Sequence, residues 1–159
     1  MMFQHYSFVQ LFTDDSKVDE KAAAAAVSSV GQNSPSSCRL RDHCSIYTAE
    51  LHATLFAFKQ AYQSQESKFM ILSGSLSALQ ALEKSKTDHA RLIPIQDMLH
   101  KIDVDQREIV FVWASGYCCI CENEAADRAA KEALEKEPTV DLMPFSDLKP
   151  LTAKYTHHV

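Results

Sequence analysis

The sequence predicts an α/β fold in which helices pack on both faces of a mixed five-stranded sheet. The first third of the chain contains three strand-like segments joined by short polar turns, which is typical of an antiparallel meander. After this meander, helices with an apolar stripe alternate with buried strand-like runs, as they do when further strands join a sheet. The 159 residues, 46 % of them hydrophobic, are enough for one core without disulfides or metal ions.

The meander begins with a buried strand at residues 8–12, a nearly unbroken apolar run that suits a strand covered on both faces. The second strand falls on the alanine-rich run 22–26. Alanine alone favours a helix, but this run is short, lies between two turn signals and is followed by β-branched residues. Residues 38–41 alternate in polarity and are predicted as the third strand, half exposed.

The second half of the chain is predicted from helical spacing. A helix of about four turns begins near Thr48, because apolar residues recur there at intervals of three and four. The residues of this stripe are Leu51, Leu55, Phe58 and Tyr62. The remaining elements, in chain order, are a strand at 68–72, a helix capped by Ser75 with Leu76, Leu79 and Leu82 facing inward, a helix at 89–102, a strand at 109–113 and a helix at about 123–137 that packs through Ala126, Ala129, Ala130 and Ala133.

The sequence also predicts where the folded domain ends. Pro138 stops the last helix, because the residue before a proline disfavours the helical conformation. Residues 1–138 are therefore predicted as one domain. Residues 139–159, which carry Pro144 and Pro150, are predicted as a loosely attached C-terminal tail.

Composition limits the class of protein. The net charge of −5 argues against strong nonspecific binding to nucleic acids but leaves room for a local basic patch. No apolar run approaches the length of a membrane span, and the first six residues lack the regions of a signal peptide. The five cysteines, an odd number, are interpreted as reduced thiols of an intracellular protein of the cytoplasm or nucleus, not a secreted one.

Three acidic residues stand where distant segments meet in a fold of this kind. Asp14 follows the first strand, Glu50 lies near the start of the first helix, and Asp127 lies near the start of the last. Chemistry in open α/β sheets collects at strand ends, so the carboxylate that the first strand delivers is a candidate for a metal or acid–base site. The residues alone leave alternatives open: an acidic turn at Asp14, and a solvated helix acid at Asp127.

Four segments of the chain resemble, in the same order, the landmark segments of type 1 ribonuclease H. They are residues 12–17 (Phe-Thr-Asp-Asp-Ser-Lys), 47–51 (Tyr-Thr-Ala-Glu-Leu), 71–79 (Ile-Leu-Ser-Gly-Ser-Leu-Ser-Ala-Leu) and 112–127, which ends in Asn-Glu-Ala-Ala-Asp. The resemblance covers roughly residues 8–150 and is strongest to the ribonuclease H domains of non-LTR retrotransposon polyproteins. It implies the ribonuclease H-like fold and, as a neighbour, the rest of a reverse transcriptase polyprotein.

The resemblance implies hydrolysis of the RNA strand of RNA–DNA hybrids with two Mg²⁺ ions, for which Mn²⁺ can substitute. Carboxylates suit this task because Mg²⁺ prefers oxygen ligands. By position, Asp14 is similar to the carboxylate that bridges both metals, Glu50 to the ligand of the leaving-group metal and Asp127 to the ligand of the water-activating metal. Contacts to substrate phosphates are expected near three residues, Ser16, Lys17 and Ser75. We expect a monomer.

The sequence departs from the family pattern at several positions. Gly74 stands where the family carries a further catalytic aspartate, so one ligand of the leaving-group metal is missing. Asp15, Cys119 and Glu122 replace glycines, and Tyr117 replaces a histidine thought to help product release. Removing one preorganised electrostatic contact typically costs ~10²–10³ in rate. Low turnover is therefore expected.

Three readings of the function remain. The first is a hybrid nuclease impaired by Gly74; the second is a non-catalytic nucleic-acid-binding or structural module derived from a retrotransposon. The third, an integrase-like nuclease of the same fold, is disfavoured by the context of residues 123–127. A soft-metal site at Cys118, Cys119 and Cys121 would need a fourth ligand, so drift in that loop is preferred. We also expect Asp14, Glu50 and Asp127 to converge with Gly74 facing them, and at least one of these acids to have a raised pKa.

Overall fold

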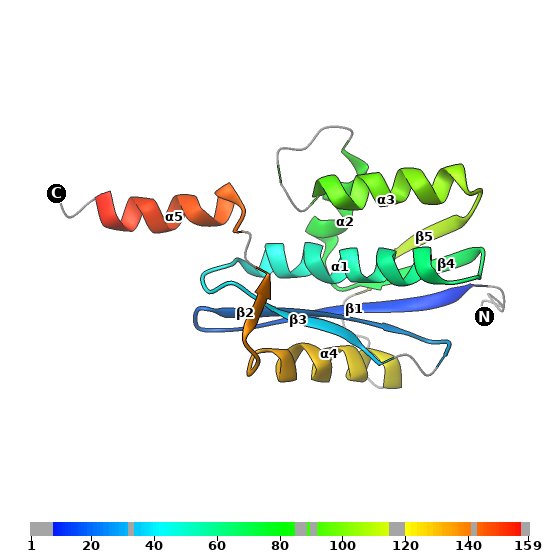
Figure 1. The fold of residues 1–159 in the computed structure, drawn as a ribbon, viewed down its shortest axis with the longest axis horizontal. Helices are drawn as coiled ribbons and strands as arrows, with labels where there is room; N and C mark the ends of the chain where they lie inside the picture. Colours follow the sequence, from blue (N-terminus) through cyan, green and yellow to red (C-terminus); the bar gives the residue numbers. More distant parts are fainter. Residues whose placement is uncertain are drawn as a thin grey trace.

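The structure, a computed structural model, describes residues 8–31, 34–84, 89, 92–114, 120–140 and 143–156. Six strands and five helices lie within these residues (Figure 1). None of these helices is long and apolar enough to span a membrane. In chain order the elements are β1 (Val9–Val18), β2 (Lys21–Ser28), β3 (Ser36–Leu40), α1 (Ile46–Gln63), β4 (Lys68–Ser73), α2 (Leu76–Glu83), α3 (Leu92–Val104), β5 (Glu108–Trp113), α4 (Cys121–Ala133), β6 (Pro138–Val140) and α5 (Phe145–Thr156).

The strands form one mixed sheet with the order β5-β4-β1-β2-β3-β6. β1, β2 and β3 are antiparallel neighbours, whereas β4 runs parallel to β1, β5 parallel to β4 and β6 parallel to β3. Helices α1, α2 and α3 lie on one face of the sheet and α4 lies on the other (Figure 1). The predicted α/β class, with a mixed sheet and helices on both faces, is confirmed. The predicted count of five strands is wrong, because the three-residue β6 adds a sixth.

The segment predicted as a tail makes defined contacts with the rest of the chain. Val140 in β6 pairs with Leu40 in β3, although the sequence places the end of the domain at residue 138. Farther along, the carboxylate of the buried Asp147 in α5 accepts hydrogen bonds from the backbone N–H of Ser45 (2.9 Å) and the hydroxyl of Thr48 (2.6 Å). The first turn of α5 is thus joined to the start of α1. The division of the chain at residue 138 stays a prediction.

The alanine run forms strand β2, as predicted, because helices cover it on both faces. All five residues of the run are fully buried. Ala22 packs with Ala49 of α1, whereas the next residue, Ala23, packs with Ala133 of α4. This alternation is that of a strand whose successive side chains face opposite sides. The tertiary structure therefore overrides the helical propensity of alanine.

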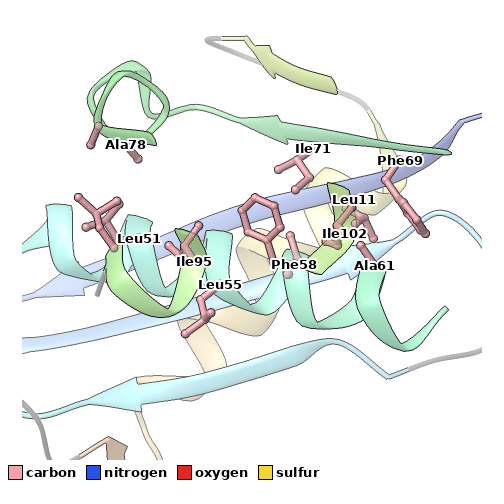
Figure 2. Packing of buried hydrophobic residues seen from close by; sticks show 14 of the residues in the cluster. Leu11, Leu51, Leu55, Phe58, Ala61, Phe69, Ile71, Ala78, Ile95 and Ile102 are labelled. Atoms are coloured by element: carbon pink, nitrogen blue, oxygen red, sulfur yellow. The ribbon is translucent and has the colours of Figure 1, made fainter. Parts of the chain in front are cut away.

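Large apolar side chains fill the space between the sheet and helices α1 and α3 (Figure 2). Phe58 and Leu51 of α1 are fully buried in one cluster with Leu11 of β1 and Ile71 of β4. Ile95 of α3 belongs to the same cluster. Burial of such side chains is worth ~1.5–3 kcal/mol each, so this face carries most of the hydrophobic stabilisation.

Two details of the predicted helical stripes are wrong. Tyr62 is 42 % exposed, because Ala61, three residues after Phe58, continues the buried stripe of α1 instead. Leu76 is 44 % exposed, because the short helix α2 turns Ala78 and Ala81 toward the core. In both cases an alanine takes the buried position, which a pattern search for large apolar residues overlooks.

Helix α4 packs through small side chains, as predicted. Its buried residues are Ala126, Ala129, Ala130 and Ala133. Ala129 and Ala130 form a cluster with Ala25 of β2, so alanine meets alanine across this interface. The helix ends at Ala133, four residues before the predicted end, and the chain then turns into β6.

Candidate functional site

The end of β4 leaves a site open beside the central strand β1. β4 pairs with β1 only as far as Ser73, opposite Thr13, and the chain then turns through Gly74 into α2. Beyond this point β1 continues, paired with β2 alone, and carries Asp14 and Asp15. Two consecutive carboxylates therefore lie just past the end of β4, where the sheet is narrower.

Asp14 and Asp15 face opposite sides of the sheet, since side chains alternate along a strand. Phe12 belongs to the cluster that contains Ala126 of α4, so Asp14, two residues later, lies on the α4 side. Leu11 belongs to the cluster of α1, so Asp15, four residues later, lies on the α1 side. Each face of the sheet thus receives one acid from β1.

On the α4 side, Asp14 interacts with Asp127 and Lys131. The pKa of Asp14 is above its ordinary value, mainly because burial disfavours the charged form and also because Asp127 repels it. The backbone N–H of Asp15, which donates to Oδ1 of Asp14 at 2.9 Å, and the charge of Lys131 act in the opposite direction. Asp127 forms an ion pair with Lys131 one turn later, with 2.7 Å between Oδ2 and Nζ. Lys131 therefore offsets part of the negative charge on this side.

On the α1 side, Asp15 interacts with Glu50. Burial, followed by the charges of Glu50 and Asp14, raises the pKa of Asp15 to about 7. Oε2 of Glu50 accepts a hydrogen bond of 2.5 Å from the hydroxyl of Ser75. The pKa of Tyr47 is raised as well, first by burial and then by the charge of Glu50. Among the residues that the structure describes, neither Asp15 nor Glu50 has an ion pair like that of Asp127 with Lys131.

The acids therefore interact as two pairs, Asp14 with Asp127 and Asp15 with Glu50. The two pairs are connected because Asp14 and Asp15 also interact with each other. The expectation that at least one acid has a raised pKa holds for Asp14. In the part of the chain that the structure describes, no three His, Cys, Asp or Glu side chains gather closely enough to hold a metal ion. The predicted ligand set Asp14, Glu50 and Asp127 stays a prediction.

The donor set nevertheless fits a hard cation. It consists of carboxylate oxygens in half-buried positions, and Mg²⁺ is usually bound by one or two protein carboxylates together with substrate phosphates. Asp15 was missed as a site residue, because the family pattern has a glycine there and the sequence presents it only as a departure. Strand alternation together with the packing of Leu11 identifies it.

Gly74 lies in the turn between β4 and α2 and is exposed. A Cβ atom added to Gly74 would meet no heavy atom within 4 Å, and its φ is not in the left-handed region. Its carbonyl oxygen accepts a hydrogen bond of 3.2 Å from Nε1 of Trp113 at the end of β5. A Cβ atom at this position would therefore meet no steric obstacle and no backbone strain.

Two of the three residues predicted to contact the substrate, Lys17 and Ser75, have side chains that donate hydrogen bonds within the protein. Nζ of Lys17 donates to the carbonyl oxygen of Cys44 at 3.1 Å, and the hydroxyl of Ser75 donates to Glu50. Ser16 is half-buried on β1, opposite Ala23. Contacts from these three residues to a substrate stay predictions.

The loop before α4 falls mostly outside the described residues, and this includes Tyr117, Cys118 and Cys119. Glu122, in the first turn of α4, is half-buried, and Cys121 at the start of that helix is exposed.

Comparison with solved structures defines the class of fold. The chain is similar to the ribonuclease H1 of the halophilic archaeon Halobacterium salinarum NRC-1, with a TM-score of 0.58 and 17 % identity over 80 % of this chain and 97 % of that one. It is also similar to the foamy viral protease-reverse transcriptase in complex with dsDNA (TM-score 0.61, 18 % identity, 80 % of this chain and 94 % of that one). The native protease-reverse transcriptase of Prototype Foamy Virus gives a TM-score of 0.66 at 15 % identity, over 84 % of this chain and 22 % of that one. The chain therefore has the ribonuclease H fold.

The chain matches nearly the whole length of the archaeal ribonuclease H1 but only about a fifth of the native foamy virus protease-reverse transcriptase. No protein-family model matches the sequence, and no curated protein does.

Proposed function

We propose that this chain is a ribonuclease H-type domain that binds RNA–DNA hybrids and hydrolyses their RNA strand with Mg²⁺ or Mn²⁺, at a rate reduced by Gly74. The observation that carries the proposal is the placement of four carboxylates around one end of the central strand. Asp14 and Asp15 come from β1 itself, Asp127 from the helix on one face and Glu50 from the helix on the other. Burial and the neighbouring acids raise the pKa of Asp14 and of Asp15, and a divalent cation would relieve the repulsion between these carboxylates.

The two pairs would hold the cations in different ways. Asp14 and Asp127 would hold one ion, and Glu50, whose acidic neighbour is Asp15, would hold the other. Bound Mg²⁺ supplies activation of the attacking water and stabilises the charge of the leaving oxygen. Glu50 accepts a hydrogen bond from Ser75, and Asp127 forms an ion pair with Lys131. Substrate phosphates would complete the coordination, with Ser16 and Lys17 close to the same strand end.

The expected rate is low because Gly74, in the turn after β4, supplies no carboxylate. Loss of one preorganised charge in such a site costs ~10²–10³ in rate. Asp15 places a carboxylate on the α1 side, but from β1 rather than from the turn after β4. A partial replacement is therefore expected rather than a full one.

The second candidate is a non-catalytic nucleic-acid-binding module, and the ion pair of Asp127 with Lys131 favours it. A carboxylate that is already paired at 2.7 Å must give up this partner, or share it, to bind a cation. In either case we propose an intracellular monomer that originates from a non-LTR retrotransposon and belongs to a reverse transcriptase polyprotein.

Cleavage of a labelled RNA–DNA hybrid under single-turnover conditions tests the proposal. We expect slow, Mg²⁺- or Mn²⁺-dependent cleavage of the RNA strand, no cleavage of double-stranded DNA, and loss of the activity in Asp14→Asn. Hybrid binding without any cleavage would establish the binding module instead. Cleavage that persists unchanged in Asp14→Asn would show that the carboxylates at the end of β1 are not the active site.

A further inference from the structure

We propose that Ser75 is the positioning residue that fixes the carboxylate of Glu50, and that Trp113 holds the turn that carries Ser75. The inference rests on the proposed function, since Glu50 is the acid that α1 contributes to the site. It reassigns Ser75 from a donor for substrate phosphate to a donor within the protein.

The hydrogen bonds around the Ser75 hydroxyl identify Glu50 as the acceptor of its proton. A serine hydroxyl has a single O–H donor and two acceptor lone pairs. As the N-cap of α2, the oxygen of Ser75 accepts from the backbone N–H of Ala78 at 3.2 Å. Its proton goes to Oε2 of Glu50 at 2.5 Å, a distance typical of a hydroxyl bound to a charged carboxylate. The neighbouring hydroxyl of Ser77, at 3.2 Å, must then act as the donor toward Ser75.

Burial makes this hydrogen bond hard to replace. Ser75 is only 6 % exposed, so water has little access to its hydroxyl. Glu50, by contrast, is a long side chain that is half-buried beside the negative charge of Asp15. A donor fixed in place offsets that repulsion and selects one orientation of the Glu50 carboxylate.

The turn that carries Ser75 is itself held from both sides. The backbone N–H of Ser75 donates to the hydroxyl of Ser73 at 3.1 Å, and Nε1 of Trp113 donates to the carbonyl oxygen of Gly74 at 3.2 Å. Ser73 and Trp113 are also partners in the register of β4 and β5. The position of the Ser75 hydroxyl is thus fixed to the sheet, and through it the position of Glu50.

Two substitutions separate positioning from helix capping. Glycine is nearly as good an N-cap as serine but has no hydroxyl, so Ser75→Gly removes the donor and leaves α2 capped. Ser75→Thr keeps both the cap and the donor. Ser77→Ala is the matched control, because it removes a neighbouring hydroxyl that is not bonded to Glu50. Trp113→Phe removes the indole donor to the turn and is the second test if Ser75→Gly does not fold.

The direct measurement is the order of the Glu50 side chain, from ¹³C relaxation of its methylene groups in the protein without metal. We expect one ordered rotamer in the wild type, in Ser75→Thr and in Ser77→Ala, and a mobile side chain in Ser75→Gly, with a smaller loss of order in Trp113→Phe. Titration with Mn²⁺ alone should show affinity about tenfold weaker in Ser75→Gly and within about twofold of wild type in Ser75→Thr. An ordered Glu50 in Ser75→Gly, or in Trp113→Phe if that is the variant that folds, would overturn the proposal. If the wild type neither binds Mn²⁺ nor cleaves hybrid, the proposed function fails, but the relaxation data still decide the role of Ser75.

Discussion

The two faces of the sheet are packed in different ways. On one face, α1 and α3 bury large residues such as Phe58 against the strands (Figure 2). On the other face, α4 meets β2 through alanines, including Ala130 against Ala25. Small side chains bury little apolar area but let a helix approach the sheet closely, and Asp127 thereby comes next to Asp14. The face with large residues therefore contributes most of the hydrophobic stabilisation. The alanine face allows Asp127 of α4 to lie next to Asp14 of β1.

The two acid pairs differ in charge as well. Asp127 on the alanine face is paired with Lys131, whereas Glu50 on the opposite face is bonded to the neutral hydroxyl of Ser75 and lies beside Asp15. Within the described residues, the pair on the alanine face therefore includes an ion pair, and the pair of Asp15 and Glu50 does not.

The largest expected effect is a difference in the free energy of unfolding between substitutions on the two faces of the sheet. Phe58→Ala should lower the free energy of unfolding by ~3–5 kcal/mol, because it removes a fully buried ring and leaves a cavity. Ala130→Gly on the alanine face should cost only about 1 kcal/mol, mostly through helix propensity. Urea unfolding followed by circular dichroism measures both values. Equal losses would show that the two faces contribute alike.

A second prediction concerns proximity on the alanine face. Ala130→Leu should cost ~1–3 kcal/mol through overpacking and should move α4 away from the sheet. The pKa of Asp14 should then fall toward its ordinary value, because burial and Asp127 are what raise it. NMR titration of the carboxyl carbons reads this directly. Ala57→Leu, which overpacks α1 instead, is the matched control and should leave the pKa of Asp14 in place; a similar fall in both variants would argue against the account.

The third prediction follows from the pKa of Asp15, which is raised from 3.8 to about 7. A raised pKa means that the folded state disfavours the charged carboxylate, so Asp15 destabilises the fold increasingly as the pH rises from about 4 to about 7. Asp15→Asn should therefore be more stable than the wild type by ~1–2 kcal/mol at pH 8 without metal, a value reduced by partial solvent exposure. At pH 4 the difference should nearly vanish. Thermal unfolding of both proteins at pH 8 and at pH 4 measures this difference in stability. A stabilisation by Asp15→Asn that is equally large at pH 4 would contradict the raised pKa of Asp15.

The smallest expected effect concerns substrate binding. Hybrid binding should be weak and should weaken further with salt, because phosphate contacts release counterions and the chain carries a net charge of −5. Lys17→Ala should reduce the slope of log affinity against log salt by about one. Lys59→Ala, on α1, is the control and should leave the slope unchanged. Affinity that does not change with salt would contradict phosphate contacts at this strand end.

Much of the fold could be predicted because its elements have local signals. The nearly unbroken apolar run of β1 and the helical stripe of α1 are local signals, and the order of such elements predicts the α/β class. β6 could not be predicted, since three residues have no period and their partner, β3, lies about a hundred residues away in the chain. Tyr62 was misplaced for a related reason, because the choice between Ala61 and Tyr62 depends on where the sheet lies under α1.

The site was predictable in part. Motif positions led to the prediction of Asp14, Glu50 and Asp127, which stays a prediction as a catalytic set. Which acids interact with each other could not be predicted, because it depends on which face of β1 each acid occupies. Asp15 could be assigned to the α1 side only once Leu11 was seen to pack against α1. Asp147, which caps the start of α1 from a distant helix, carries no local signal in its own segment.

The most direct test of the central claim is single-turnover cleavage of a labelled hybrid by Gly74→Asp at matched Mg²⁺. A Cβ atom at Gly74 would meet no heavy atom within 4 Å. Under the proposed function, a carboxylate there would help to hold the cation that stabilises the leaving oxygen, whose charge develops in the transition state. The account predicts cleavage faster than wild type by about one to three decades, and no gain in Gly74→Asn, which has the same shape without the charge. A folded Gly74→Asp that cleaves no faster than the wild type would contradict the claim that a missing carboxylate limits this domain.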